Sequence, residues 1–382
     1  MAKRKPAEPK PSERKTEAAA STFRKLVRQP APDRTSVPPL STGSTLLNLA
    51  CSNRADAALL PGHYYLLVGD SSSGKTHLAK QILAEASIHP AYADYDLILD
   101  NPERGDLADT ERFFGPRLAR RLRPPTDRGP SRTIEDFYDN LDTTIQAGKP
   151  FVYVLDSEDA LDSAAAVKVA TDNRKIRQRK CEGTRGSGDD PKFKASYGDG
   201  KAKEHSSSLR RAHGALADTG SMLIVIKQTR DNIGPDAMFN PKTRSGGRAL
   251  TFYATLELWF SIAGKLKRTV NDIDRKIGSV LRIQVKKNRL SGRDRQVDLR
   301  FYPSTGFDDA GSMIDYLLRE KHWTGTEGRL AAPEFDFNGS TEKLIARLEE
   351  VGRIEELASL VGSVWGKVEE ACAVHRRNRY AE

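Results

Sequence analysis

A phosphate-binding loop is the clearest chemical feature of the sequence. Residues 69–76 read GDSSSGKT and match the pattern GxxxxGK[ST], after an apolar run at 63–68 and before a helical run at 77–86. In that setting the glycines let backbone N–H groups turn inward around phosphate oxygens. Lys75 supplies positive charge, and the Thr76 hydroxyl can hold Mg²⁺. We therefore predict a nucleotide and Mg²⁺ site formed by Gly69, Asp70, Ser71, Ser72, Ser73, Gly74, Lys75 and Thr76.

Two later apolar runs end in polar side chains that could serve the same site. Residues 151–155 read FVYVL and are followed by Asp156. An acid at the end of a strand downstream of a phosphate loop acts on Mg²⁺, often through water. The run 222–226 ends in Lys227 and Gln228. The Gln228 amide can sense the terminal phosphate, and the alternative interpretation is an ordinary polar residue at a strand end.

Composition and pattern indicate a folded, basic α/β protein. The 382 residues carry 62 Lys and Arg against 52 Asp and Glu, a net charge of +10. Apolar strands alternate with helical stretches from residue 40 onward, which predicts a mostly parallel sheet. The three cysteines lie far apart, and the sequence contains neither a long apolar run nor a secretory signal. We expect a reducing cytoplasm and no membrane partner.

The chain divides into three predicted parts. Residues 1–33 form a disordered basic tail with a short oligomerisation arm, 34–301 an ATPase core, and 302–382 a small helix-rich C-terminal domain. Residues 162–208 form a basic insertion in the core. Residues 164–215 alone carry 13 basic and 6 acidic side chains. Five glycines between 183 and 200 predict a mobile loop that is a poor helix.

Several segments together resemble the RecA family of DNA recombinases. They are STGS at 41–44, DSEDAL at 156–161, QTR at 228–230, MFNP at 238–241, GGRALTFYA at 246–254 and RIQVKKNR at 282–289. The resemblance covers roughly 40–325, and the long insertion is similar to that of phage recombinases of the UvsX type. It implies a RecA-like P-loop core that binds ATP and Mg²⁺, forms helical homo-oligomeric filaments on single-stranded DNA and pairs it with double-stranded DNA.

The resemblance also implies catalytic residues. The family carries a glutamate after the strand that follows the phosphate-loop helix, which corresponds here to Glu103, with Asp100 as the alternative. Lys287 and Arg289 correspond to cations that reach the ATP of the next protomer in the filament. The alternative for both is a solvated basic strand end. The residue expected beside the adenine falls near Thr110, where no aromatic side chain stands out.

Two segments are predicted to contact DNA, the basic insertion and the loop 231–248. In the loop, Met238 and Phe239 offer an apolar wedge between bases, or pack the loop onto its own core. On the insertion, the run 174–180 either contacts DNA or is a solvated insert. The predicted DNA-binding residues are Arg174, Lys175, Arg177, Arg230, Met238, Phe239, Lys242, Arg244, Gly246, Gly247 and Arg248.

Three functions remain open at this stage. The first is a DNA-dependent ATPase that exchanges strands in recombination and repair, with a loading mediator and a single-strand-binding protein as further partners. The second is a RecA-fold accessory protein that binds nucleotide without exchanging strands. The third is a hexameric helicase, against which the segment GGRALTFYA argues. The sequence does not decide between a bacterial, nucleoid-associated protein and a phage-encoded one.

We predict that the two DNA segments have separate roles. Alanine at Arg174, Lys175, Arg177, Arg179 and Lys180 should weaken DNA binding most at low salt. The salt slope should fall by about 0.7 for each phosphate of a single strand that the variant no longer neutralises. Arg244→Ala with Arg248→Ala should instead uncouple DNA from ATPase stimulation.

Fluorescence anisotropy across a salt series and DNA-stimulated phosphate release compare the two variants. If the insertion variant loses stimulation at saturating DNA while the loop variant keeps it, the roles are reversed.

Overall fold

The computed structural model describes residues 37–105, 108–127, 129–181, 199–231, 242–244, 247–374 and 376. The described residues from Val37 onward belong to one compact unit. The predicted basic tail with its arm, Met238, Phe239 and Gly246 lie outside the described residues. Among the residues described, no helix combines the length and the apolar character that a membrane span requires.

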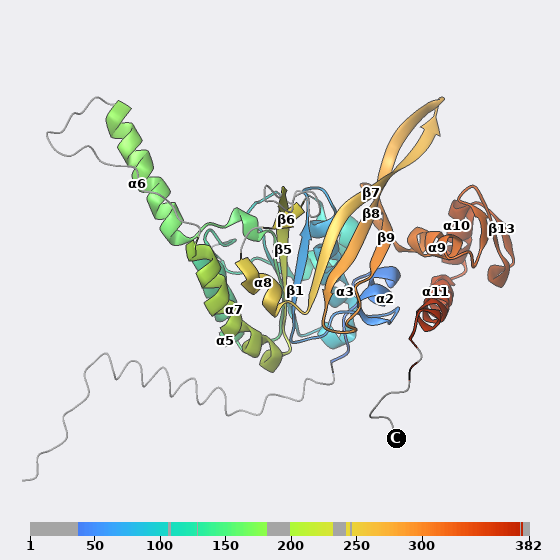
Figure 1. Cartoon of the computed structure of the whole chain (residues 1–382), viewed down its shortest axis with the longest axis horizontal. Helices are drawn as coiled ribbons and strands as arrows, with labels where there is room; N and C mark the ends of the chain where they lie inside the picture. Colours follow the sequence, from blue (N-terminus) through green and yellow to red (C-terminus); the bar gives the residue numbers. More distant parts are fainter. Residues whose placement is uncertain are drawn as a thin grey trace, which may run out of the picture. The chain divides into compact units, whose positions relative to one another are not determined.

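A ten-stranded mixed sheet forms the centre of this unit, in the order β10-β9-β8-β7-β1-β5-β4-β2-β3, with β6 paired to β5 (Figure 1). Neighbouring strands from β7 to β3 are parallel, whereas β8, β9 and β10 continue the sheet antiparallel. The strands are β1 (Tyr64–Gly69), β2 (Asp96–Asp100), β3 (Leu122–Arg123), β4 (Phe151–Leu155), β5 (Met222–Asp231), β6 (Lys242–Arg244), β7 (Leu256–Val270), β8 (Ile273–Asn288), β9 (Gln296–Tyr302) and β10 (Gly306–Asp308). The predicted α/β class with a mostly parallel core is confirmed.

Helices cover both faces of the parallel strands. Successive strand residues point to opposite faces, and β1 and β4 are buried at every position, so each face needs a covering layer. On one face, Leu67 and Val154 pack with the core residues of α3. On the other, Leu66 and Tyr153 pack with those of α5, α7 and α8. The helices of this part are α2 (Thr45–Ser52), α3 (Lys75–Ile88), α4 (Thr110–Arg121), α5 (Ile134–Gln146), α6 (Ala164–Cys181), α7 (Asp199–Thr219) and α8 (Gly247–Tyr253), with short 3₁₀ turns η2 (Pro90–Tyr92) and η3 (Glu158–Ala160).

The basic insertion contains helices, contrary to the sequence prediction. The run 174–180 lies within α6, and α7 begins at Asp199. Lys and Arg are good helix formers, and the glycines that argued against a helix lie at 183 and beyond, after α6 ends. Figure 1 shows α6 projecting from the body of the molecule. Its side chains Arg174, Lys175 and Arg177 are exposed, as a phosphate-contacting surface requires.

Strands β7 and β8 form a long hairpin that extends beyond the sheet (Figure 1). Asn271 and Asp272, the two turn residues, both have positive φ, at 54° and 59°. This conformation belongs to the two-residue turn whose twist matches that of the flanking strands, and Asn and Asp tolerate it better than most residues.

The segment after Tyr302 contains a small sheet as well as helices. It comprises α9 (Asp309–Arg319), β11 (Thr324–Thr326), β12 (Arg329–Ala332), η5 (Pro333–Phe335), β13 (Phe337–Gly339), α10 (Thr341–Glu350) and α11 (Ile354–Ala371). Strands β11, β12 and β13 form an antiparallel sheet that the sequence did not predict. Trp323, Leu344 and Val361 share the core of the large sheet's α3 face. A separate domain at 302–382 stays a prediction of the sequence.

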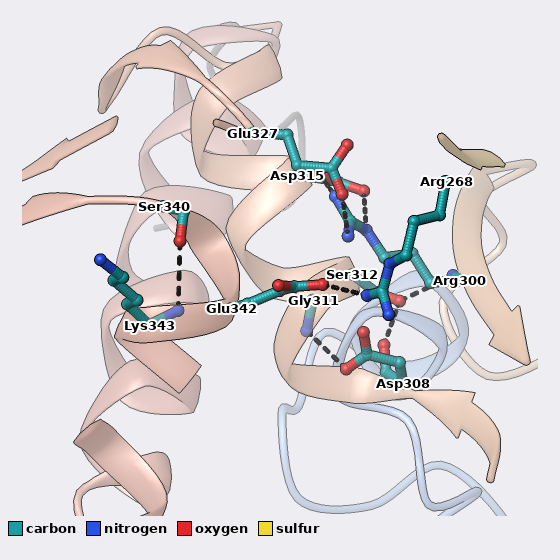
Figure 2. Close-up of polar contacts among 10 residues, drawn as sticks. All are labelled: Arg268, Arg300, Asp308, Gly311, Ser312, Asp315, Glu327, Ser340, Glu342 and Lys343. Carbon is teal, nitrogen blue, oxygen red and sulfur yellow. Dashed lines mark hydrogen bonds and ion pairs between the residues drawn. The ribbon is translucent and has the colours of Figure 1, made fainter. Parts of the chain in front are cut away.

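A buried arginine joins this C-terminal segment to the large sheet (Figure 2). Arg300 on β9 is 5% exposed, and its Nε and Nη2 donate to the two Asp315 oxygens at 2.5 and 2.6 Å. Its Nη1 donates to Glu327 Oε1 at 2.8 Å. Burial works to lower the pKa of Arg300, but hydrogen bonds and charge from Asp315 outweigh it and raise that pKa above its usual value. A second, exposed pair, Arg268 with Glu342, links the β7–β8 hairpin to α10.

We predict that Arg300→Met lowers the free energy of unfolding by about 2 kcal/mol. Loss of the guanidinium leaves two carboxylates facing each other. The cost stays below that of a fully buried pair, because the Asp315 and Glu327 side chains are 41% and 61% exposed. Urea unfolding measures the change.

Arg319→Met is the matched control, because the Arg319 side chain is 48% exposed and its ion pairs are longer, at 3.7 and 3.8 Å. It should change stability by less than about 0.5 kcal/mol. Equal losses in both variants would contradict the role given to Arg300.

Candidate nucleotide and DNA site

The phosphate loop joins the carboxyl end of β1 to the first residue of α3. Gly74 has a φ of +91°, a conformation open to glycine at little cost. A Cβ at Gly69 would lie 2.7 Å from the Phe260 carbonyl oxygen on the neighbouring strand β7, so that position also needs glycine. The free N–H groups at the start of α3 thus face the loop and form a site for anions.

Lys75 lies inside this loop. Its Nζ donates to the carbonyl oxygens of Gly69 at 2.9 Å and Asp70 at 2.6 Å, and the residue is 6% exposed. Burial lowers the pKa of Lys75, and the nearby Asp156 and Asp70 oppose that shift. The ammonium is therefore held in place by the loop rather than by the core of the protein.

Thr76 and Asp156 form an oxygen pair beside the loop. The Thr76 hydroxyl donates to Asp156 Oδ2 at 2.7 Å, across the gap between α3 and the end of β4. The described residues contain no cluster of three or more metal-ligating side chains. Mg²⁺ held mainly by nucleotide phosphates needs only one or two protein oxygens, so a hydroxyl and a carboxylate here fit that ion.

Glu103 and Gln228 meet at the same edge of the sheet. Gln228 Nε2 donates to Glu103 Oε1 at 3.0 Å, and the Ser157 hydroxyl donates to the same oxygen. Thr229, the next residue on β5, donates to the Asp70 carboxylate in the phosphate loop. The structure thus brings together Lys75, Thr76, Asp156, Glu103 and Gln228.

Asp100, the alternative to Glu103, is buried in the body of the protein. Its carboxylate accepts from the Ser131 N–H at 2.8 Å, the Ser131 hydroxyl at 2.5 Å and the Tyr153 hydroxyl at 2.7 Å. Burial raises the pKa of Asp100, against the lowering effect of these hydrogen bonds. The side chain is 0% exposed, so it anchors the 131 segment rather than meeting a solvent-borne substrate.

A cavity of about 290 Å³ opens beside the phosphate loop. Phe114 on α4 lines it, one helical turn after Thr110, and its ring lies 4.7 Å from that of His77. In the sequence alone, no aromatic side chain near Thr110 stands out. The adjacent pair Phe113 and Phe114 was the available signal, and it gains meaning only once α4 packs against α3.

Lys287 and Arg289 lie away from this edge in the same chain. On β8, residue 287 lies opposite Glu257 of β7, and Glu257 lies opposite Leu66 in the first half of β1. The phosphate loop, in contrast, follows the last residue of β1. Lys287 Nζ donates to the Thr251 and Phe252 carbonyls at 2.5 and 2.9 Å, and Arg289 Nη2 donates to Phe252 O at 2.6 Å. A second cavity, of about 450 Å³, opens there, and Arg289 lines it.

The predicted second DNA loop starts and ends in regular structure. Strand β5 continues past Gln228 to Asp231, and β6 returns antiparallel, with Arg230 opposite Thr243. Gly247 and Arg248 begin α8. The side chains of Arg230, Lys242, Arg244 and Arg248 lie outside the described residues, so their contacts with DNA stay predictions.

Comparison with known proteins identifies related sequences. The family model described as "RecA N-terminal domain" matches residues 190–308. "Protein RecA" of Teredinibacter turnerae is 28% identical over 287 residues, 74% of this chain and 71% of that protein. "Protein RecA" of Parvibaculum lavamentivorans and of Bifidobacterium breve are each 29% identical over 280 residues, 72% of this chain. That match spans 65% and 60% of their lengths.

We predict opposite outcomes for the two acids. Glu103→Gln should lower ATP turnover by about a hundredfold or more, because the amide cannot accept a proton from the attacking water. Asp100→Asn should leave turnover close to that of the parent chain, because an amide can still accept from Ser131 N–H and donate to Tyr153. Single-turnover phosphate release measures both.

Nucleotide binding serves as the control. The Glu103→Gln variant should still bind ATP in a filter-binding assay, because the change affects hydrolysis rather than binding. If the Asp100→Asn variant loses turnover while the Glu103→Gln variant stays active, Asp100 rather than Glu103 is the catalytic acid.

Proposed function

Since the chain belongs to the RecA family, we propose that it is an ATP-dependent recombinase that forms helical filaments on single-stranded DNA and catalyses homologous pairing and strand exchange. The contact that carries this proposal is the Gln228–Glu103 hydrogen bond at the phosphate-loop edge. It joins Gln228, which lies three residues before the second DNA segment, to the predicted catalytic acid. In this proposal, DNA binding and hydrolysis share this one side-chain contact.

Each residue at the edge has a distinct role in the proposed reaction. Bound ATP with Mg²⁺ supplies the phosphoryl group that is transferred to water. Lys75 and the start of α3 orient the phosphates and offset their charge, and Thr76 and Asp156 hold the metal ion. Glu103 orients water and takes up its proton. Gln228 holds Glu103 and responds to the terminal phosphate.

The opposite edge of the sheet supports a site shared between protomers. Lys287 and Arg289 lie toward the opposite end of the strands from their own phosphate loop, because residue 287 pairs with Glu257 and so lies level with Leu66 of β1. In a head-to-tail filament this edge faces the phosphate loop of the neighbour. Cations from the neighbour would then stabilise charge on the transferred group, as an arginine finger does.

The basic surfaces support DNA as the polyanionic partner. Exposed Arg174, Lys175 and Arg177 on α6 offer phosphate contacts that read no sequence. The proposal includes double-stranded DNA as the second substrate, a mediator and a single-strand-binding protein as helpers, and the bacterial cytoplasm as the location. The related sequences named "Protein RecA", 28–29% identical to this chain, support the same proposal.

We predict helical filaments in negative-stain micrographs of the chain with single-stranded DNA and a non-hydrolysable ATP analogue. Filaments should be absent without nucleotide, because the site shared between protomers then lacks the phosphate charge that attracts Lys287 and Arg289 of the neighbouring chain. Closed rings would indicate a helicase, and no assembly would indicate an accessory protein.

A mixing experiment tests the shared site directly. Lys75→Ala chains lack the phosphate-loop half, and Lys287→Ala/Arg289→Ala chains lack the opposite half. Each alone should be inactive, yet an equimolar mixture should regain about a quarter of parental turnover, because random head-to-tail contacts restore that share of complete sites. An inactive mixture that still forms filaments would contradict the shared site.

A further inference from the structure

Outside the phosphate-contacting residues, a cluster of polar groups lies fully buried under the same edge. Glu158, Lys227 and His205 are each 0% exposed. Glu158 Oε2 forms an ion pair with Lys227 Nζ, and its Oε1 lies 2.8 Å from His205 Nε2. Because a buried charge without a partner costs several kcal/mol, each member of this cluster depends on the others, and their geometry is strongly constrained.

The three residues come from three separate elements. Glu158 opens η3, two residues after Asp156. Lys227 precedes Gln228 on β5. His205 lies on α7, the helix that completes the basic insertion. The cluster therefore ties the insertion to the ends of β4 and β5, which carry the predicted metal ligand and phosphate sensor.

A continuous run of contacts connects this cluster to the catalytic acid. Lys227 Nζ lies 3.5 Å from Asp159 Oδ1, and the other Asp159 oxygen accepts the Gln228 backbone N–H at 2.6 Å. The Gln228 side chain in turn holds Glu103 at 3.0 Å. His205 on the insertion helix is thus connected to Glu103 through residues that all form hydrogen bonds or ion pairs.

Helix α7 also contacts the elements on either side of it. His205 Nδ1 lies 2.7 Å from the Tyr138 hydroxyl on α5. Further along, Arg210 Nε donates to the Tyr253 hydroxyl at 3.4 Å, and the His213 and Tyr253 rings lie 5.8 Å apart. Tyr253 belongs to α8, which follows the predicted second DNA loop. Both predicted DNA segments are therefore connected to the same helix.

We propose that His205 is a positioning residue through which DNA bound at the insertion controls the placement of Gln228 and Glu103. The inference rests on the proposed function and adds a second route from DNA to the nucleotide site. A shift of α7 by about 1 Å would break a 2.8 Å hydrogen bond and leave a buried carboxylate short of a partner. The helix and the two strand ends must therefore move together.

The test detaches α7 from the cluster without leaving a lone charge. Tyr138→Phe with His205→Leu removes the histidine and the Tyr138 hydroxyl that it contacts, and it keeps the Glu158–Lys227 ion pair. Turnover without DNA should stay close to that of the parent chain. The increase caused by saturating poly(dT) should fall about tenfold, the size of a typical coupling between two sites.

Two further variants separate positioning from simple stability. His205→Gln should restore stimulation, because its amide can donate to Glu158 and accept from Tyr138. Ser208→Ala on the same helix should leave both the turnover and its stimulation by DNA unchanged. The Ser208 hydroxyl forms hydrogen bonds only with Glu204 and Arg211 among the contacts described, and both lie within α7.

Each outcome of these measurements decides the inference. Stimulation retained in the Tyr138→Phe/His205→Leu chain would overturn it, and so would an equal loss of turnover with and without DNA. A parent chain that does not respond to DNA would instead overturn the proposed function, and this inference with it.

Hydrogen exchange of the unaltered chain tests the same link even if the double variant fails to fold. Because coupling of binding energies is reciprocal, a non-hydrolysable ATP analogue should change amide protection in α7 around residue 205. Single-stranded DNA alone should change protection at residues 227 and 228. No change in α7 on adding the nucleotide analogue would overturn the inference.

Discussion

The parallel pairing of β1, β5, β4 and β2 is the constraint on which the rest of the structure depends. In-register parallel strands end at one edge, so residues from distant parts of the sequence meet there. Thr76, Asp156, Glu103 and Gln228 lie on or shortly after four different strands and come within hydrogen-bonding distance in pairs. The same register places Lys287 and Arg289 at the opposite edge, which is why a complete site needs two protomers in our proposal.

Much of this edge could be predicted from the sequence because its signals are local. The loop 69–76 carries its own glycines, and the runs 151–155 and 222–226 are apolar enough to be recognised as buried strands. Strand β6 and the sheet β11–β13 escaped prediction, since three- and four-residue strands exist only through their pairing partners. Helix α6 was mistaken for a loop because glycines that lie beyond its end were counted against it.

Burial explains the parts of the site that the sequence left open. Asp100 and Glu103 are both acids near the end of β2, and nothing in the local sequence separates them. The fold places Asp100 among Ser131 and Tyr153 and leaves Glu103 beside Gln228. The Glu158–Lys227–His205 cluster has no sequence signature either, because its members come together only when α7 packs against α5 and the strand ends.

The most direct test of this account is a cryo-electron microscopy structure of the chain with single-stranded DNA and a non-hydrolysable ATP analogue. We expect the nucleotide between two protomers, with Lys75, Glu103 and Gln228 of one chain and Arg289 of the next around its terminal phosphate. A terminal phosphate enclosed by a single chain, with Arg289 still bound to the Phe252 carbonyl, would contradict the account.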